Sequence, residues 1–286
     1  MAPQPDLTVT LTNPRADRVS RVRALSGRSA RLRFGRFLAE GPQCVREAVR
    51  FMPDDVVDVY LTEAAAERYP EIVDAAMAAS LYLHIGTPEV LAAMSPDAQG
   101  VLAVCRTRAT TLATLMTRGV DGDAPRLVAI LNNARDPGNA GTVIRAADAA
   151  GADLVVLAGD SVELYNPKLV RSTAGSLFHL DVVVGVELAD AVAALRAAGL
   201  QVLAADGSGD HDLDDLQDAA ERSTTARPSL AAPTAWVFGN EAWGLDDADR
   251  SLSDAVVRVP IRGKAESLNL ATAATVCLYA SSRAQR

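Results

Sequence analysis

The stretch "NNARDPGNAGTVIRAADAAG" at residues 132–151 decides the fold, and it directly follows the apolar run "RLVAIL" at 126–131. It combines one Pro, three Gly and three Asn, which are typical of turns, with two Arg. We interpret the two segments as a buried strand and a turn that leads into a helix. In an open α/β sheet, ligands bind beyond the carboxyl ends of the strands, so this turn marks a candidate site.

The sequence after residue 126 predicts a parallel α/β sheet. Its short runs are rich in Val and Leu and nearly continuous, as expected for strands covered on both faces. Helical patterns separate most of them, and the polar, acidic segment 207–233 is expected to be a surface excursion. The expected strands are 126–131, 153–159, 181–186, 201–207, 235–240 and 255–261. The expected helices are 141–151, 166–178, 188–199 and 267–283.

A second alternating α/β pattern occupies residues 14–108. It begins with a basic segment at 18–33, predicted to form one helix, and continues with a strand at 36–41. A helix at 42–51 opens with Pro42, where a missing N–H is tolerated. Further strands are expected at 56–62, 81–86 and 100–107, with helices at 63–80 and 88–94. We therefore expect a smaller domain at 14–108, a linker at 109–125 and a second domain at 126–286.

Composition excludes several classes of protein. No apolar run approaches the roughly 20 residues that span a bilayer, and the first residues lack a secretory pattern. Three scattered cysteines, Cys44, Cys105 and Cys277, are expected to be reduced and buried. With only three dispersed histidines, a metal site or a histidine-based triad is not expected. We expect a cytoplasmic protein without membrane or metal.

The charge is unevenly distributed. The chain carries −8 overall, yet residues 15–36 hold eight Arg and one Asp, which leaves −15 for the rest. A basic block on an acidic protein indicates a polyanionic partner such as RNA. A general preference for Arg is the alternative, since the chain has only two lysines. The candidate RNA-binding residues are Arg15, Arg18, Arg21, Arg28, Arg31, Arg33 and Arg36.

The common nucleotide-binding motifs are absent. The turn at 132–151 has Gly138 and Gly141 but no G-x-G-x-x-G, and no Walker motif occurs in the chain. A nicotinamide-dependent oxidoreductase on a doubly wound sheet is therefore the least favoured function.

Three separated segments, read together, carry a family resemblance. They are 132–151, "WVFGNEAWGL" at 236–245 and "VRVPIRGKAESLNLATAATVCLY" at 257–279. In order, spacing and context this set resembles the three motifs of the SpoU (TrmH) class of SPOUT RNA ribose 2′-O-methyltransferases. The resemblance covers about 126–283 and extends more weakly to "RFLAEGPQCVREAV" at 36–49. It implies an S-adenosylmethionine-binding domain with a trefoil knot, a homodimer, and an N-terminal substrate-binding domain.

The resemblance also assigns residues to catalysis. Arg145 matches the family's catalytic arginine, with a surface salt bridge as the alternative. Asn139 matches a supporting residue, or it caps the helix. Glu241 matches the second-motif acid, or it is a surface carboxylate. Ser267 and Asn269 match the polar pair beside the reacting centre, although Ser267 also suits a helix N-cap.

Further residues are assigned to the cofactor and to RNA. Trp243 is expected to pack rather than to stack on a base, and Gly239 to let the backbone approach the cofactor. Asn133 and Arg135 either contact RNA phosphate or shape the turn. Arg262 and Lys264 are further candidates for RNA contact. The residues expected to hold S-adenosylmethionine are Phe238, Gly239, Asn240, Val259, Ile261 and Leu268.

The sequence thus predicts an S-adenosylmethionine-dependent enzyme that methylates a ribose 2′-hydroxyl, with ribosomal RNA the first choice of substrate. Transfer RNA as substrate and a non-catalytic RNA-binding relative are the alternatives. The resemblance implies that the arginine acts as a general base. Because a guanidinium stays protonated in proteins, we expect Arg145 instead to bind phosphate and to stabilise the developing alkoxide.

Overall fold

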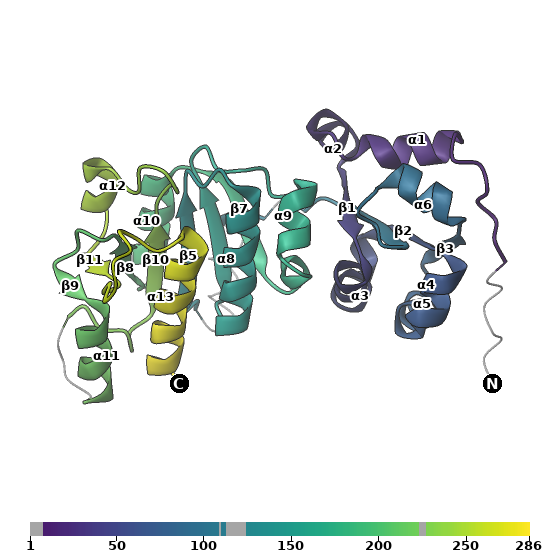
Figure 1. Cartoon of the computed structure of the whole chain (residues 1–286). Helices are drawn as coiled ribbons and strands as arrows, with labels where there is room; N and C mark the ends of the chain where they lie inside the picture. Colours follow the sequence, from purple (N-terminus) through teal and green to yellow (C-terminus); the bar gives the residue numbers. More distant parts are fainter. Residues whose placement is uncertain (1–7, 109, 113–123, 223–226) are drawn as a thin grey trace. The chain divides into compact units, whose positions relative to one another are not determined.

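A computed structural model of the protein describes residues 8–108, 110–112, 124–222 and 227–286. The chain forms two compact units (Figure 1). Unit 1 comprises Met1–Arg108 and Tyr165–His179, and unit 2 comprises Ala109–Leu164 and Leu180–Arg286. The expected linker at 109–125 falls mostly outside the described residues. The grouping of Tyr165–His179 with unit 1 differs from the continuous second domain that the sequence predicted.

Unit 1 is built on a four-stranded mixed sheet with the order β1-β4-β2-β3. β4 is antiparallel to β1 and β2, whereas β2 and β3 are parallel. The strands are β1 (Arg36–Glu40), β2 (Val56–Leu61), β3 (Tyr82–Ile85) and β4 (Val101–Arg106). The helices are α1 (Asp17–Ala24), α2 (Arg28–Phe34), α3 (Pro42–Phe51), η1 (Pro53–Asp55), α4 (Glu63–Arg68), α5 (Pro70–Ala78), α6 (Pro88–Met94), α9 (Pro167–Ser172) and η2 (Ser176–Phe178).

The basic segment forms two helices, so the prediction of one helix over 18–33 was wrong. Gly27 has an extended backbone and separates α1 from α2. Arg31 fixes this break, because its Nη1 donates to the carbonyl oxygens of Leu25 at 2.9 Å and Ser26 at 2.6 Å. Its guanidinium thereby satisfies two carbonyls of the turn that follows α1.

A buried carboxylate holds the segment Tyr165–His179 in unit 1. The Glu40 side chain at the end of β1 is 3% exposed and forms an ion pair with Arg171 of α9. Arg171 also pairs with Asp97 at 3.0 Å, and the Ser95 hydroxyl donates to Glu40 at 2.6 Å. Burial of an unpaired carboxylate is costly, so Arg171 makes this arrangement stable.

Unit 2 contains a seven-stranded sheet in the order β7-β6-β5-β10-β8-β11-β9, and every neighbouring pair is parallel. The predicted parallel α/β class is confirmed. The strands are β5 (Leu127–Asn132), β6 (Leu154–Ala158), β7 (Asp181–Val186), β8 (Gln201–Ala205), β9 (His211–Asp212), β10 (Thr234–Phe238) and β11 (Ala255–Arg258). The helices are α8 (Pro137–Ala150), α10 (Leu188–Ala197), α11 (Leu213–Glu221), α12 (Asp247–Ser251) and α13 (Leu270–Ala284). The expected excursion at 207–233 thus supplies an edge strand and a helix.

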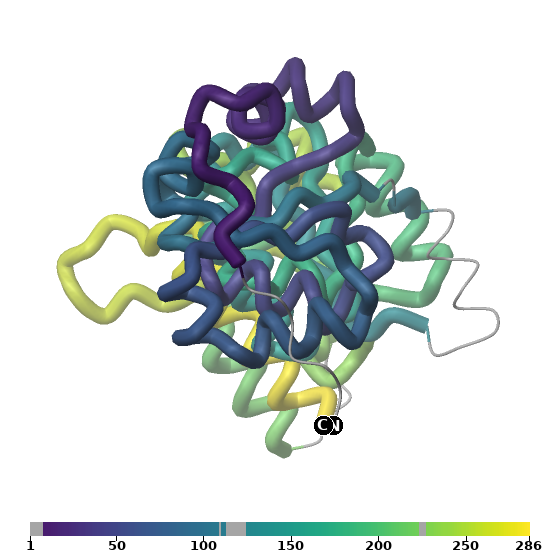
Figure 2. Tube along the Cα trace, turned by 90° about the vertical axis from the view of Figure 1, so that its right-hand side faces the viewer, coloured from purple at the N-terminus to yellow at the C-terminus, as the bar shows by residue number. Residues whose placement is uncertain are grey.

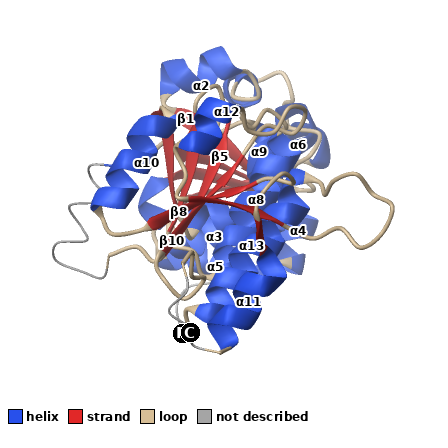
Figure 3. Ribbon diagram, turned by 90° about the vertical axis from the view of Figure 1, so that its left-hand side faces the viewer, coloured by secondary structure: helices blue, strands red, loops and turns tan. Residues whose placement is uncertain are grey.

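Helices cover both faces of this sheet (Figure 3). On one face, Ala191, Val192 and Leu195 of α10 pack with alternate strand residues such as Val128 and Ile130. On the other face lie α8 and α13, which pack against each other and against β5. The buried Trp236 of β10 donates from Nε1 to the Ser281 hydroxyl of α13 at 2.9 Å. This bond satisfies two polar groups inside an otherwise apolar layer.

The segment that joins β11 to α13 is an extended loop that projects from unit 2 (Figure 2). Its residues 261–267 are all exposed. Within the described part of the chain, no helix has both the length and the apolar character needed to cross a bilayer. The threading of α13 through an earlier loop stays a prediction.

The reactivity of the cysteines provides a test of the packing of both units. All three are buried and free, as the sequence predicted. Burial raises the pKa of the Cys44 thiol to about 11 and that of Cys277 to about 12, and it also raises the pKa of Cys105. Because only the thiolate is nucleophilic, we expect no alkylation of the native protein by iodoacetamide at mildly alkaline pH. Mass spectrometry should show three labels after denaturation, and labelling of the native chain would contradict this packing.

Arg171→Ala tests the anchor of Tyr165–His179. It leaves the Glu40 carboxylate buried without its ion pair, so unfolding in urea should become easier by about 3 kcal/mol. The matched control is Arg222→Ala, which breaks an exposed pair with Asp218. That change should have an effect below about 1 kcal/mol. Equal effects of the two substitutions would refute the role given to Arg171.

Candidate active site

The three segments singled out from the sequence meet at one edge of the unit 2 sheet. β5 and β10 are parallel neighbours, with Leu131 opposite Phe238. The turn that begins at Asn133 and the loop that begins at Gly239 therefore leave the sheet side by side. This is the edge where open parallel sheets bind ligands.

Asp136, rather than Asn139, caps α8. The Asp136 side chain accepts from the backbone N–H of Asn139 at 2.7 Å, and Pro137 follows at the first helical position. The expectation that Asn139 is the cap was wrong, because the helix begins two residues before it. The Asn139 side chain is consequently available for contacts outside its own helix.

Glu241 holds the start of α8. Its carboxylate accepts from the backbone N–H of Arg135 at 3.2 Å and of Asp136 at 3.1 Å. The Asn139 side-chain amide also lies 3.5 Å from the same carboxylate. A carboxylate at a helix N-terminus is favourable because it meets free N–H groups and the positive end of the helix dipole. Glu241 is therefore a structural link between two loops and not an isolated surface carboxylate.

Asparagines shape the turn itself. Asn133 has φ +55°, and its side-chain oxygen accepts from the N–H of Asp160 at 2.9 Å. Its carbonyl oxygen accepts from the side chain of Asn240, which is nearly buried, at 2.6 Å. Of the two roles left open for Asn133, the structure supports the shaping of the turn.

Asn269 joins the third segment to the first. Its side chain caps α13 by accepting from the N–H of Ala271 at 2.9 Å, and its amide donates to the Asn139 side chain at 3.0 Å. The alternative that Ser267 caps this helix was wrong, and Ser267 is exposed. Glu241, Asn139 and Asn269 thus form a continuous polar chain across three segments that are far apart in the sequence.

A pocket of about 330 Å³ lies beside this polar chain. All six residues predicted to hold the cofactor line it, and so do two of the predicted catalytic residues. These residues are Phe238, Gly239, Asn240, Val259, Ile261 and Leu268, with Glu241 and Ser267. Asn139 and Asn269 are connected to the pocket through Glu241.

The structure adds a second reason for Gly239 and differs from expectation at Trp243. A Cβ on Gly239 would lie 2.4 Å from the backbone of Gly244, so the glycine is required by the fold of its own loop. Trp243 does not pack inside the protein, since 60% of it is exposed. The Arg135 guanidinium lies 5.9 Å from the Trp243 ring centre. The exposed ring and the guanidinium form a surface of the kind that RNA bases stack on.

Sequence reasoning missed two acidic residues of the pocket, Asp206 and Glu266. Burial alone would raise the pKa of Asp206, but hydrogen bonds from the Ser208 N–H and hydroxyl, together with Arg250, hold it below its ordinary value. Asp206 therefore stays ionised at the pocket wall. It directly follows β8, and this position at a strand end was the signal available in the sequence.

Arg145 lies on the exposed side of α8 and does not line the pocket. The described residues give it no hydrogen-bond or ion-pair partner, so the salt-bridge alternative has no support. Its guanidinium is free to meet a ligand that approaches from solvent.

The predicted RNA-binding arginines differ in exposure. Arg31 is 3% exposed and occupied with backbone carbonyls, so it is unsuited to phosphate contact. The other six of the basic segment and Arg135 are exposed.

Comparison with known proteins shows which protein family this chain resembles. Residues 126–279 match the model of the SpoU rRNA methylase family. The chain is 32% identical over 255 residues to a 23S rRNA guanosine 2′-O-methyltransferase of Bacillus subtilis, across 89% of this chain and 92% of the relative. It is 41% identical over 152 residues to a 23S rRNA uridine 2′-O-methyltransferase of Streptomyces viridochromogenes, of which the match spans about half.

Solved structures give the same result. The SpoU methyltransferase AviRb of Streptomyces viridochromogenes in complex with AdoMet has a TM-score of 0.77 at 31% identity, and the match covers 94% of this chain and 98% of that one. An AdoMet-bound rRNA methyltransferase of Sinorhizobium meliloti has a TM-score of 0.76 at 26% identity, with 96% and 97% covered. The chain therefore belongs to the SpoU rRNA methylase family.

Proposed function

We propose that the protein transfers a methyl group from S-adenosylmethionine to a ribose 2′-hydroxyl of ribosomal RNA. The observation that carries this proposal is the convergence of three distant segments around one pocket, joined by Glu241, Asn139 and Asn269. The rRNA methyltransferases among its relatives support the class of substrate.

The pocket suits the proposed cofactor in size and chemistry. Its volume of about 330 Å³ falls within the range of small-molecule sites. Val259, Ile261 and Leu268 offer apolar contact for an adenine ring, and three carboxylates offer negative potential for a cation. S-adenosylmethionine, when bound, supplies a methyl group on a positively charged sulfur. Asp206, Glu241 and Glu266 are the acidic groups that favour such a charge.

Arg145 is proposed to bind the phosphate beside the target ribose and to stabilise the alkoxide that develops at the 2′-oxygen. It is exposed and has no partner among the described residues, which leaves its donors for this role. Glu241 supports the role indirectly, because it fixes the start of the helix that carries Arg145. Preorganised charge of this kind is effective because it needs no rearrangement during the reaction.

The alternatives have less support. A non-catalytic relative has no need to keep an open pocket beside an intact polar chain. An oxidoreductase is excluded by membership of the methylase family. Transfer RNA stays an alternative substrate. We further propose that the protein acts in the cytoplasm as a homodimer and that its cofactor-binding domain is knotted.

Arg145→Lys separates the two roles of Arg145. If the arginine stabilises charge, Lys keeps the charge but loses the planar donor pair, so kcat should fall about tenfold or more at every pH. Rates of RNA methylation measured across pH would test this. If Lys restores the rate at high pH with a shifted limb, the residue is a general base and the role proposed here is refuted.

Asp206→Asn tests the pocket independently of RNA. The asparagine oxygen can still accept from Ser208, so the loop should keep its fold while the negative charge is lost. Affinity for S-adenosylmethionine in calorimetric titration should fall about tenfold. The control is Asp218→Asn on the exposed face of α11, which should leave the affinity unchanged. Equal affinity of Asp206→Asn and wild type would contradict the assigned site.

A further inference from the structure

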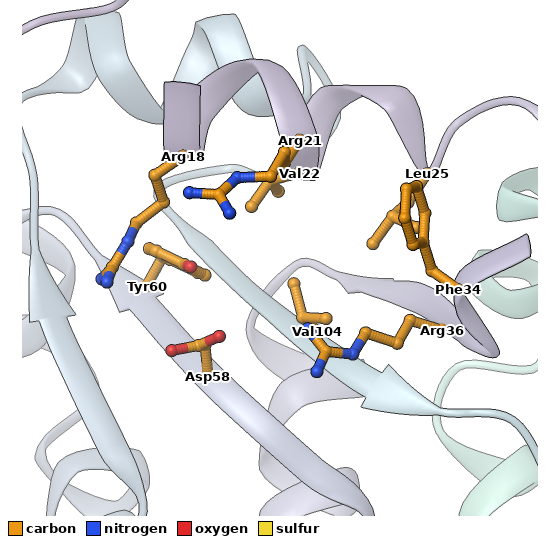
Figure 4. Close-up of a pocket in the computed structure, with 9 residues that line it drawn as sticks. All are labelled: Arg18, Arg21, Val22, Leu25, Phe34, Arg36, Asp58, Tyr60 and Val104. Atoms are coloured by element: carbon orange, nitrogen blue, oxygen red, sulfur yellow. The ribbon is translucent and has the colours of Figure 1, made fainter. Parts of the chain in front are cut away.

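Unit 1 has a pocket of its own, which the assigned activity does not use. Its volume is about 370 Å³, and it lies between α1, α2 and three strands of the sheet. Its chemically distinctive residues are Arg18, Arg21, Phe34, Arg36, Asp58 and Tyr60. Figure 4 shows the Arg21 side chain reaching in from α1 and the Arg36 side chain from β1, with Asp58 and Tyr60 on the neighbouring strand β2.

Tyr60 lines this pocket, and among the described residues its hydroxyl has no hydrogen-bond partner. The residue as a whole is 1% exposed. Burial, reinforced by the Asp58 charge, raises the pKa of Tyr60 to about 12, so the hydroxyl keeps its proton. The hydroxyls of buried tyrosines normally have a partner, and a ligand in the pocket would provide one.

Asp58 adds an acceptor to the floor of the pocket. Its Oδ1 is bonded to His84 Nε2 at 2.8 Å, while no described residue donates to Oδ2. His84 also lies 3.1 Å from Arg18 Nη1. This chain fixes the orientation of the carboxylate and leaves one oxygen facing the pocket.

The arginines and the aromatic ring that line the pocket can also contact a ligand. Arg36 has no hydrogen-bond or ion-pair partner among the described residues, and Arg21 has only a 3.4 Å contact with the Asp17 carbonyl. Phe34, at the end of α2, is 51% exposed, and the Arg33 guanidinium lies 5.3 Å from its ring centre. An exposed aromatic ring beside guanidinium groups is a stacking platform for a nucleobase.

We propose that this pocket takes one unstacked nucleotide of the RNA substrate, with its phosphate on Arg21 and Arg36, its base against Phe34, and the base edge on Asp58 and Tyr60. The inference rests on the proposed function only in taking RNA as the substrate. The carboxylate makes the pocket unsuitable for a phosphate alone, because it repels anions and requires N–H donors. Guanine fits best, since it presents two adjacent donors, N1–H and N2–H.

The test is the affinity of the full-length protein for two short fluorescent oligonucleotides, measured by anisotropy. One is all-uridine RNA and the other carries a single central guanosine. Wild type should prefer the guanosine-containing RNA about tenfold. Asp58→Asn should abolish the preference, because the asparagine oxygen can still accept from His84 but the charge is lost. Tyr60→Phe should weaken binding of the guanosine-containing RNA about three- to tenfold.

The matched controls are Tyr82→Phe, on an exposed ring of β3, and Asp74→Asn, on an exposed position of α5. Both should bind as wild type does, and thermal melting should show that all four variants are folded. The inference is overturned if wild type binds both RNAs equally, or if the pocket variants behave like their controls. In that case methylation of ribosomal RNA by the same wild-type sample still stands as a separate test of the proposed function.

Discussion

The hydrogen bonds between the Glu241 carboxylate and the start of α8 are the constraint on which the site depends. Two parallel strands end side by side, and each continues into a loop whose backbone N–H groups need partners. Glu241 supplies acceptors from one loop to Arg135 and Asp136 in the other. Without this carboxylate, the N–H groups of Arg135 and Asp136, which lead into α8, would lose this acceptor and the second loop would lose its attachment.

The other polar contacts extend this constraint to the third segment. Asn139 is held near Glu241, and it in turn accepts from Asn269 at the start of α13. Both helices pack on the same face of the sheet, so their relative position is already determined by apolar contact. The short polar chain then needs only to orient the loops that border the pocket.

The sequence predicted most strands of unit 2 well because their apolar runs are nearly continuous and are separated by helical patterns. The prediction failed where contacts between distant segments determine the local structure. Leu25 to Gly27 break the basic helix because Arg31 folds back onto the open carbonyls. Asp136 takes the cap because Glu241, distant in sequence, fixes the backbone around it. Asp206 was not predicted because a single acidic residue after a strand belongs to no motif. Its role is evident only from its position in the pocket wall.

Opposite charges serve opposite purposes in this chain. The pocket of unit 2 is lined by Asp206, Glu241 and Glu266, which favour a cationic ligand and repel a polyanion. The exposed arginines include several on α1 and α2, Arg135 and Arg145, and none of these lines the pocket of unit 2. Because the chain as a whole carries −8, exposed arginines are the groups that attract a polyanion to an otherwise acidic protein. An acidic surface of this kind limits unspecific RNA binding.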